Sequence, residues 1–221
     1  MKRGISGKIR KLACTSMAVA GLSFSGNLHA QGNQDRNNYG LEDHAKVVAV
    51  NVLVNGLISG IGAARNDRPF LQNFIRGAFG GLLISSGNYM VARNEDLAWP
   101  SKFVTSVGSS IAYNTSRGRP MFDTFGMDLG PIYLSLENIQ GGDRNLNWHL
   151  IPGSLAGIAG GIISGSRFSL ESSLRYGTPI FYDHNLQDDV RGYRYGFYGS
   201  NVLLLNENIT NGETRHELIH I

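Results

Sequence analysis

The stretch VVAVNVLVNGLISGIGAA, residues 47–64, decides the fold class of the first half of the chain. It contains no charged residue, and its polar members Asn51, Asn55 and Ser59 recur every four residues. Residues four apart form one row along a helix, so the stretch predicts a helix with one face of small polar side chains. Its length approaches the roughly 18 to 20 apolar residues that a membrane span needs.

The same spacing returns twice, in GAFGGLLISS and in GSLAGIAGGIISG. The first carries Gly77, Gly81 and Ser85, and the second has glycine at positions 153, 157, 161 and 165. Because each glycine in a helix costs up to about 1 kcal/mol relative to alanine, such rows predict faces where another backbone comes close. They are typical of helices packed in a membrane and also of helices that cross tightly in a soluble core, and both interpretations are open.

From Met121 on, the pattern changes to that of strands. In IYLSLE, Ile132, Leu134 and Leu136 alternate with polar neighbours. Similar alternation is expected around Phe168 and Leu170 and in residues 191–206, whereas GGDRNLN, residues 141–147, predicts a turn. The fold class is therefore α+β: packed small-residue helices at about 47–112 and 153–165, a few antiparallel strands within about 121–205, and a terminal helix.

The first thirty residues are graded like a secretory signal peptide, with a basic start, an apolar stretch and small residues before a cleavage site after Ala30. A polar lead-in, residues 31–46, then precedes a single domain, residues 47–221. Truncation of this domain at its C-terminus is one of the explanations considered below for the last residues. The protein is accordingly expected to be exported, to the periplasm, the cell envelope or the medium.

Removal of residues 1–30 changes the formal net charge from +3 to −2, because the leader holds five basic residues and no acidic one. The remaining chain has no run of Lys or Arg that could follow a phosphate backbone, which argues against nucleic-acid binding. The single cysteine, Cys14, lies in the leader, so the mature chain has neither a disulfide nor a thiolate metal ligand.

The chain ends on RHELIHI, residues 215–221, which contains a His-Glu-x-x-His pattern. On a helix, His216 and His220 lie one turn apart on one face and can bind one Zn²⁺, while Glu217 reaches a metal-bound water as general base. Residues 214–221 resemble the active-site helix of the zincin metallopeptidases, particularly the gluzincin branch. That resemblance implies zinc ligation by His216 and His220, catalysis by Glu217, and a peptide or protein substrate.

The body of the chain is also similar to uncharacterised exported bacterial proteins that carry this helix. A catalytic zinc requires a third protein ligand, which zincins take from downstream of the helix. Three explanations are open: the natural chain continues past Ile221, the ligand comes from His149 or His184 upstream, or the pattern is coincidental. His44 is expected to be a solvated lead-in residue.

Two hypotheses about function follow. The first is an exported protein related to zinc metallopeptidases, which hydrolyses peptides by zinc-activated water if its site is complete. The second is a non-catalytic envelope protein, or a membrane-associated one, built on glycine-rowed helices. Neither hypothesis predicts a particular peptide sequence as substrate, or an oligomeric state.

Overall fold

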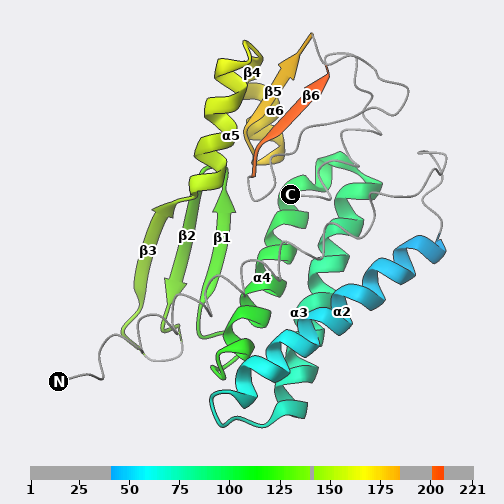
Figure 1. The fold of residues 1–221 in the computed structure, drawn as a ribbon, viewed down its shortest axis with the longest axis vertical. Coiled ribbons are helices and arrows are strands. Elements are labelled where there is room, and N and C mark those ends of the chain that lie inside the picture. The colour runs from blue at the N-terminus through cyan, green and yellow to red at the C-terminus, as the bar shows by residue number, and fades with distance from the viewer. Residues whose placement is uncertain (1–40, 140–141, 185–200, 207–221) are drawn as a thin grey trace.

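The structure is a computed structural model that describes residues 41–139, 142–184 and 201–206. Its first part is a layer of three helices: α2 (Leu41–Ala64), α3 (Phe70–Arg93) and α4 (Ala98–Ser116), with a short 3-10 turn η1 (Glu95–Leu97) before α4. Helix α3 packs against α2 on one side and against α4 on the other (Figure 1). The helix expected from residue 47 begins at Leu41, so the end of the expected lead-in is helical.

A three-stranded antiparallel meander follows α4. It consists of β1 (Phe125–Leu129), β2 (Ile132–Glu137) and β3 (Asn145–Leu150), in that spatial order. Strand β1 runs beside α4, so α4 lies between the sheet and the other two helices (Figure 1). The hydroxyl of Ser110 on α4 accepts a 2.9 Å hydrogen bond from the Gly126 amide of β1 and thereby fixes this contact.

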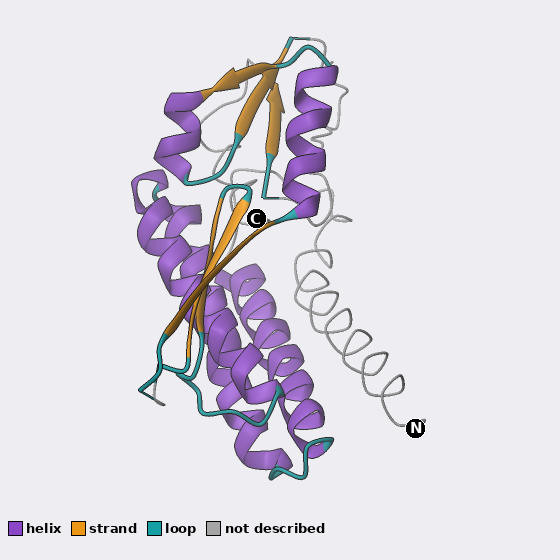
Figure 2. Cartoon of the chain, turned by 90° about the vertical axis from the view of Figure 1, so that its left-hand side faces the viewer, coloured by secondary structure: helices purple, strands orange, loops and turns teal. Residues whose placement is uncertain are grey.

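The last described part is a smaller αβ unit at one end of the molecule (Figure 2). Helix α5 (Pro152–Ile163) leads from β3 into β4 (Arg167–Ser169), α6 (Leu170–Tyr176), β5 (Ile180–Asp183) and β6 (Leu203–Asn206). Strands β4 and β5 are antiparallel, whereas β5 and β6 are parallel. The apolar core of this unit contains Val91, Ala98, Tyr176, Ile180, Leu203 and Leu205, so it also holds one end of α3 and of α4.

These elements confirm the α+β class and correct two local predictions. The segment expected to be a turn around Asn145 is strand β3, because its residues pair in register with β2, Leu134 opposite Trp148. The strand expected around Phe168 and Leu170 stops at Ser169, whose hydroxyl accepts from the Ser172 amide and caps helix α6. Strand β2 lies where the alternation placed it. Tyr193, Tyr195 and Phe197 lie outside the described residues.

Candidate functional site

The three residues of the His-Glu-x-x-His pattern, His216, Glu217 and His220, lie outside the described residues, as does the leader with its expected cleavage site at Ala30. The structure therefore contributes no geometry for a zinc site at the end of the chain. The predicted zinc ligands, the catalytic role of Glu217 and the bound Zn²⁺ stay predictions from the sequence.

The histidines considered as upstream ligands belong to different elements. His149 lies on the exposed strand β3, where its ring packs against Tyr133 with 4.9 Å between centroids, and His184 is an exposed residue directly after β5. His44 lies in the first turns of α2. Within residues 45–139, 142–184 and 201–206, no three side chains of His, Cys, Asp or Glu gather as a metal ion would require.

The interface between α2 and α3 is built from small and polar residues. Asn51, Asn55 and Ser59 on α2 are 0–3% exposed, and they face the row Gly77, Gly81 and Ser85 on α3. Asn51 Nδ2 donates to Ser85 Oγ at 2.9 Å, and Ser59 Oγ donates to the Ala112 carbonyl of α4 at 3.2 Å. The predicted close-contact row on these two helices is thus present.

The glycine rows bring helix backbones together. A Cβ placed on Gly81 would lie 2.3 Å from the Asn51 carbonyl oxygen, and one on Gly80 would lie 2.6 Å from that of Gly108 on α4. No side chain fits at such separations. Helix α3 therefore has two glycine faces, one toward each neighbour, and the sequence interpretation recognised only the face toward α2.

Large apolar side chains lie on the outside of the same helices. We call this surface the outer face; it comprises residues that are 40–68% exposed, namely Leu53, Leu57 and Ile61 on α2 and Leu71, Ile75, Phe79 and Leu82 on α3. The rings of Phe70 and Phe74 cover Gly60 and Gly56 of α2 and fill the seam between the two rows. The helices thus hide their polar residues and expose their apolar ones.

Helix α2 is also long and apolar enough to cross a membrane. Its segment Ala45–Ala64 has a mean hydropathy of 1.9, with a third of it buried against the rest of the protein. Lys46 and Arg65 bracket the uncharged stretch at its two ends. Cationic side chains in these positions can reach the headgroup region of a bilayer while their stems stay on apolar surface.

The meander also exposes large apolar side chains and buries a polar one. Ser135 on one face is only 6% exposed, whereas Leu146, Trp148 and Leu150 on the other face are 71%, 67% and 47% exposed. The residues of β3 alternate, so these three side chains share one face with their β2 partners Leu136, Leu134 and Ile132. The described structure therefore exposes a second set of large apolar side chains, on the meander.

A set of polar contacts joins α4 and the preceding turn η1 to the small αβ unit. Lys102 Nζ donates to the Gly177 carbonyl at 2.5 Å, Trp99 Nε1 donates to the Leu174 carbonyl at 2.9 Å, and the Tyr176 hydroxyl donates to Glu95 Oε2 at 2.9 Å. Burial lowers the pKa of Lys102 to about 8, although Asp128 acts in the opposite direction. Burial, with the hydrogen bond to Glu95, raises the pKa of Tyr176 to about 12.

The outer face could have been found from the sequence. Leu53, Leu57 and Ile61 repeat every four residues, in antiphase with Asn51, Asn55 and Ser59, so a buried polar row implies an exposed apolar one. The comparisons with known proteins add no relative: no protein-family model matches the chain, and neither the curated proteins nor the solved structures include a significant match.

Proposed function

We propose that the protein is an exported component of the cell envelope that associates with a lipid membrane through the outer face of α2 and α3. One observation carries this proposal: the two helices bury asparagine, serine and glycine while they expose leucine, isoleucine and phenylalanine. In water this arrangement is unfavourable, because burial of a Leu or Phe side chain is worth roughly 1.5–3 kcal/mol.

Lipid changes the balance. Acyl chains are as apolar as leucine, so large side chains gain nothing by turning inward, and helices associate through close backbone contact and hydrogen bonds between polar side chains. Both features are present at the α2–α3 interface, in the approach of Gly81 to Asn51 and in the bond from Asn51 to Ser85. The cationic residues at the ends of the uncharged stretch also suit a helix in contact with headgroups.

The test is flotation of the purified full-length chain with phospholipid vesicles. Leu71→Glu places a charge at a residue that is 68% exposed on the outer face, and Leu174→Glu places the same charge at a residue that is 63% exposed on α6. We expect the first variant to lose vesicle binding and the second to keep it. Equal binding by both variants, or a wild-type chain that stays soluble and unbound, would overturn the proposal.

The second candidate function is zinc-dependent peptide hydrolysis, and it rests on RHELIHI and its resemblance to the zincin helix. In this proposal His216 and His220 hold Zn²⁺, and Glu217 takes the proton from the water that attacks a peptide carbonyl. Glu217→Gln should abolish hydrolysis and retain the metal. A variant that loses its zinc together with its activity would contradict the assignment of Glu217 as base rather than ligand.

A further inference from the structure

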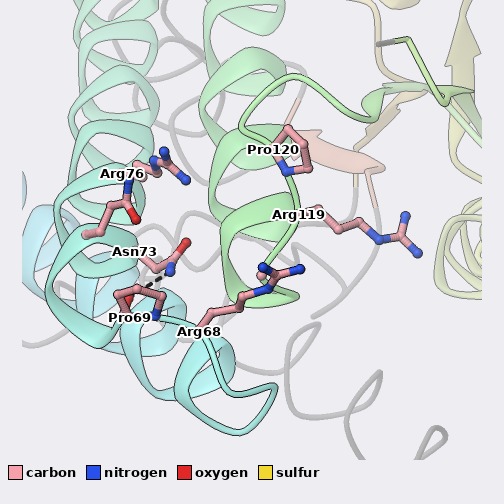
Figure 3. Close-up of a pocket in the computed structure, with 8 residues that line it drawn as sticks. Arg68, Pro69, Asn73, Arg76, Arg119 and Pro120 are labelled. Carbon is pink, nitrogen blue, oxygen red and sulfur yellow. Dashed lines mark hydrogen bonds between the residues drawn. The ribbon is translucent and has the colours of Figure 1, made fainter. Parts of the chain in front are cut away.

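A pocket of about 300 Å³ lies at the end of the helical layer where α2 meets α3 and where α4 ends (Figure 3). One wall is formed by Arg68 before α3 and by Asn73 and Arg76 in its first turns. The other wall is the segment 118–120 directly after α4. Two parts of the chain that are about fifty residues apart in sequence therefore share one cavity.

The walls of this pocket are held by local hydrogen bonds. Asn73, which is 3% exposed, donates from Nδ2 to the Pro69 carbonyl at 2.8 Å. The amides of Arg68 and Arg119 donate to the carbonyls of Ala63 and Asn114 at 3.0 and 2.9 Å. The pocket is therefore formed before any ligand enters, which lowers the entropic cost of binding.

Gly118 allows the two walls to come together. Its φ is +68°, and a Cβ at this position would lie 2.6 Å from Cγ of Arg68. Glycine adopts this backbone conformation without strain, and its missing side chain leaves room for the arginine stem. The aliphatic part of Arg68 is thus seated on the end of α4.

The pocket carries uncompensated positive charge. Residues 65–76 and 117–123 together contain five arginines and two aspartates. In the part of the chain that the structure describes, no carboxylate lies within ion-pair distance of Arg68 or Arg76, whereas Arg119 pairs with Asp123 at 3.6 Å. Figure 3 shows Arg76 extending toward Pro120 and the side chain of Arg119 pointing away.

Helix α3 adds to the positive potential. It is 24 residues long, its N-cap residue is Pro69 with no side-chain cap, and its first turn holds no acidic residue. The first amides of a helix lack partners within the helix, and the helix dipole places partial positive charge at that end. An anion in the pocket would meet this end of α3 together with the two guanidinium groups.

From this geometry we propose that the pocket binds a phosphate group through Arg68 and Arg76. The planar guanidinium group matches phosphate oxygens with paired hydrogen bonds, and a phosphate has enough oxygens to accept such pairs from two arginines at once. The phosphate has two sources, a phospholipid headgroup and a soluble phosphate compound. The phosphate site stands on the pocket alone, and only the lipid source rests on the membrane association proposed above.

The lipid source is supported by the position of the pocket. Leu71 and Ile75 of the outer face lie on α3 between or beside Gln72, Asn73 and Arg76 of the pocket, so apolar face and pocket adjoin on one helix. A lipid whose acyl chains contact the outer face would have its headgroup at the level of this arginine-rich end.

The test measures phosphate binding in two arms with the full-length chain. The first arm titrates inorganic phosphate by calorimetry. The second measures binding to phosphatidylcholine vesicles that contain phosphatidic acid. The control vesicles contain oleate instead, in the amount that gives the same negative surface charge. The variants are the double substitution Arg68→Gln with Arg76→Gln, and the matched control Arg119→Gln on the opposite pocket wall.

We expect the double variant to lose at least about tenfold in affinity in the arm that detects binding, and Arg119→Gln to change it less than threefold. Circular dichroism and the unfolding midpoint check that the double variant is folded. The proposal is overturned if the double variant loses no affinity, or if Arg119→Gln loses as much affinity as the double variant. It is also overturned if the chain binds phosphatidic acid and oleate vesicles equally and does not bind free phosphate.

The two proposals fail in different ways. If Leu71→Glu abolishes vesicle flotation while inorganic phosphate still binds in an Arg68- and Arg76-dependent manner, the pocket recognises a phosphate at a membrane-bound protein. If phosphate binds and the wild-type chain never floats with vesicles, the membrane proposal fails and the phosphate site stands with a soluble ligand.

Discussion

Asn51 of α2 and Ser85 of α3 are joined by a buried side-chain hydrogen bond of 2.9 Å, in which Asn51 Nδ2 donates to Ser85 Oγ. Both residues are 3% exposed, and Asn51 Oδ1 is buried with no partner among the described residues. A polar pair is therefore placed where a soluble protein would normally place apolar side chains. The bond ties the two helices together at the level of the glycine contacts.

This bond predicts an asymmetric pair of variants. Ser85→Ala leaves Asn51 Nδ2 buried without an acceptor and should destabilise the protein by about 1–3 kcal/mol. Asn51→Ala removes the donor Nδ2 together with the unsatisfied Oδ1. Its free energy of unfolding should therefore fall less than that of Ser85→Ala. A double-mutant cycle in urea, with both single variants and the double variant, should give a coupling of about 1 kcal/mol. Strict additivity would show that the bond contributes nothing.

The glycine contacts predict that alanine, normally favourable in a helix, is harmful at Gly81. Its Cβ would meet the Asn51 carbonyl oxygen at 2.3 Å, and this backbone can retreat only if α2 and α3 separate. Gly60→Ala is the matched control on the partner helix, since its Cβ would meet the ring of Phe70, a side chain that is 43% exposed and can shift more easily than a helix backbone.

We expect Gly81→Ala to lower the thermal midpoint clearly, and Gly60→Ala to change it by a few degrees at most. The measurement is thermal unfolding followed by circular dichroism in mild detergent. A Gly81→Ala protein as stable as the wild type would mean that the two helices do not meet at this glycine.

Stability should depend on pH in the alkaline range. The pKa of Lys102 is about 8 in the fold against 10.5 in the unfolded chain, so between these values the unfolded chain holds the extra proton and stability rises with pH. The pKa values of Tyr133 and Tyr176 are raised from 10.0 to about 12, chiefly by burial, so above pH 10 the fold holds the extra protons and stability falls.

The free energy of unfolding should therefore rise by on the order of 2 kcal/mol from pH 8 to pH 10, and then fall. Lys102→Met should remove the rise and leave the fall. The rise can be assigned to Lys102 with little interference from other lysines, because Lys46 is the only other lysine after residue 11. A rise that persists in Lys102→Met would assign it to another group.

Zinc content tests the terminal motif independently of the membrane proposal. Purified protein should contain about one zinc ion per chain, and the double substitution His216→Ala with His220→Ala should remove it. His149→Ala is the control that also asks whether an upstream histidine is a ligand. Zinc that stays bound in the double variant would leave the terminal pattern without a role.

Much of the fold could be predicted from local pattern. Small residues that recur every four positions predict the helices α2 and α3, and alternating apolar residues predict the strand β2. The structure contains these three elements at the predicted positions. Strand β3 was mistaken for a turn because Asp143, Asn145 and Asn147 are turn formers, and pairing with β2 outweighs that preference. Leu170 alternates with Phe168, yet the cap at Ser169 starts a helix there.

The phosphate pocket was not predictable in this way. Arg68 and Arg119 stand in short Arg-Pro segments, RNDRP and SRGRP, that read as ordinary helix ends. Their meeting depends on the antiparallel course of α2, α3 and α4 and on the conformation of Gly118, which no local pattern encodes. The row of Gly80 and Gly87 toward α4 was missed because its interval is seven residues rather than four.

The exposed position of Leu53, Leu57 and Ile61 has a consequence for how this protein tolerates change. In most domains the outside accepts nearly any residue and the inside accepts only apolar ones. Here the outside of α2 should accept any large apolar residue and reject charge, while its inside should reject any residue larger than the one present. A saturation scan of α2 would then give a substitution profile that is the reverse of the usual one, and a lineage could drift freely among leucine, isoleucine and phenylalanine while its glycines and asparagines stay fixed.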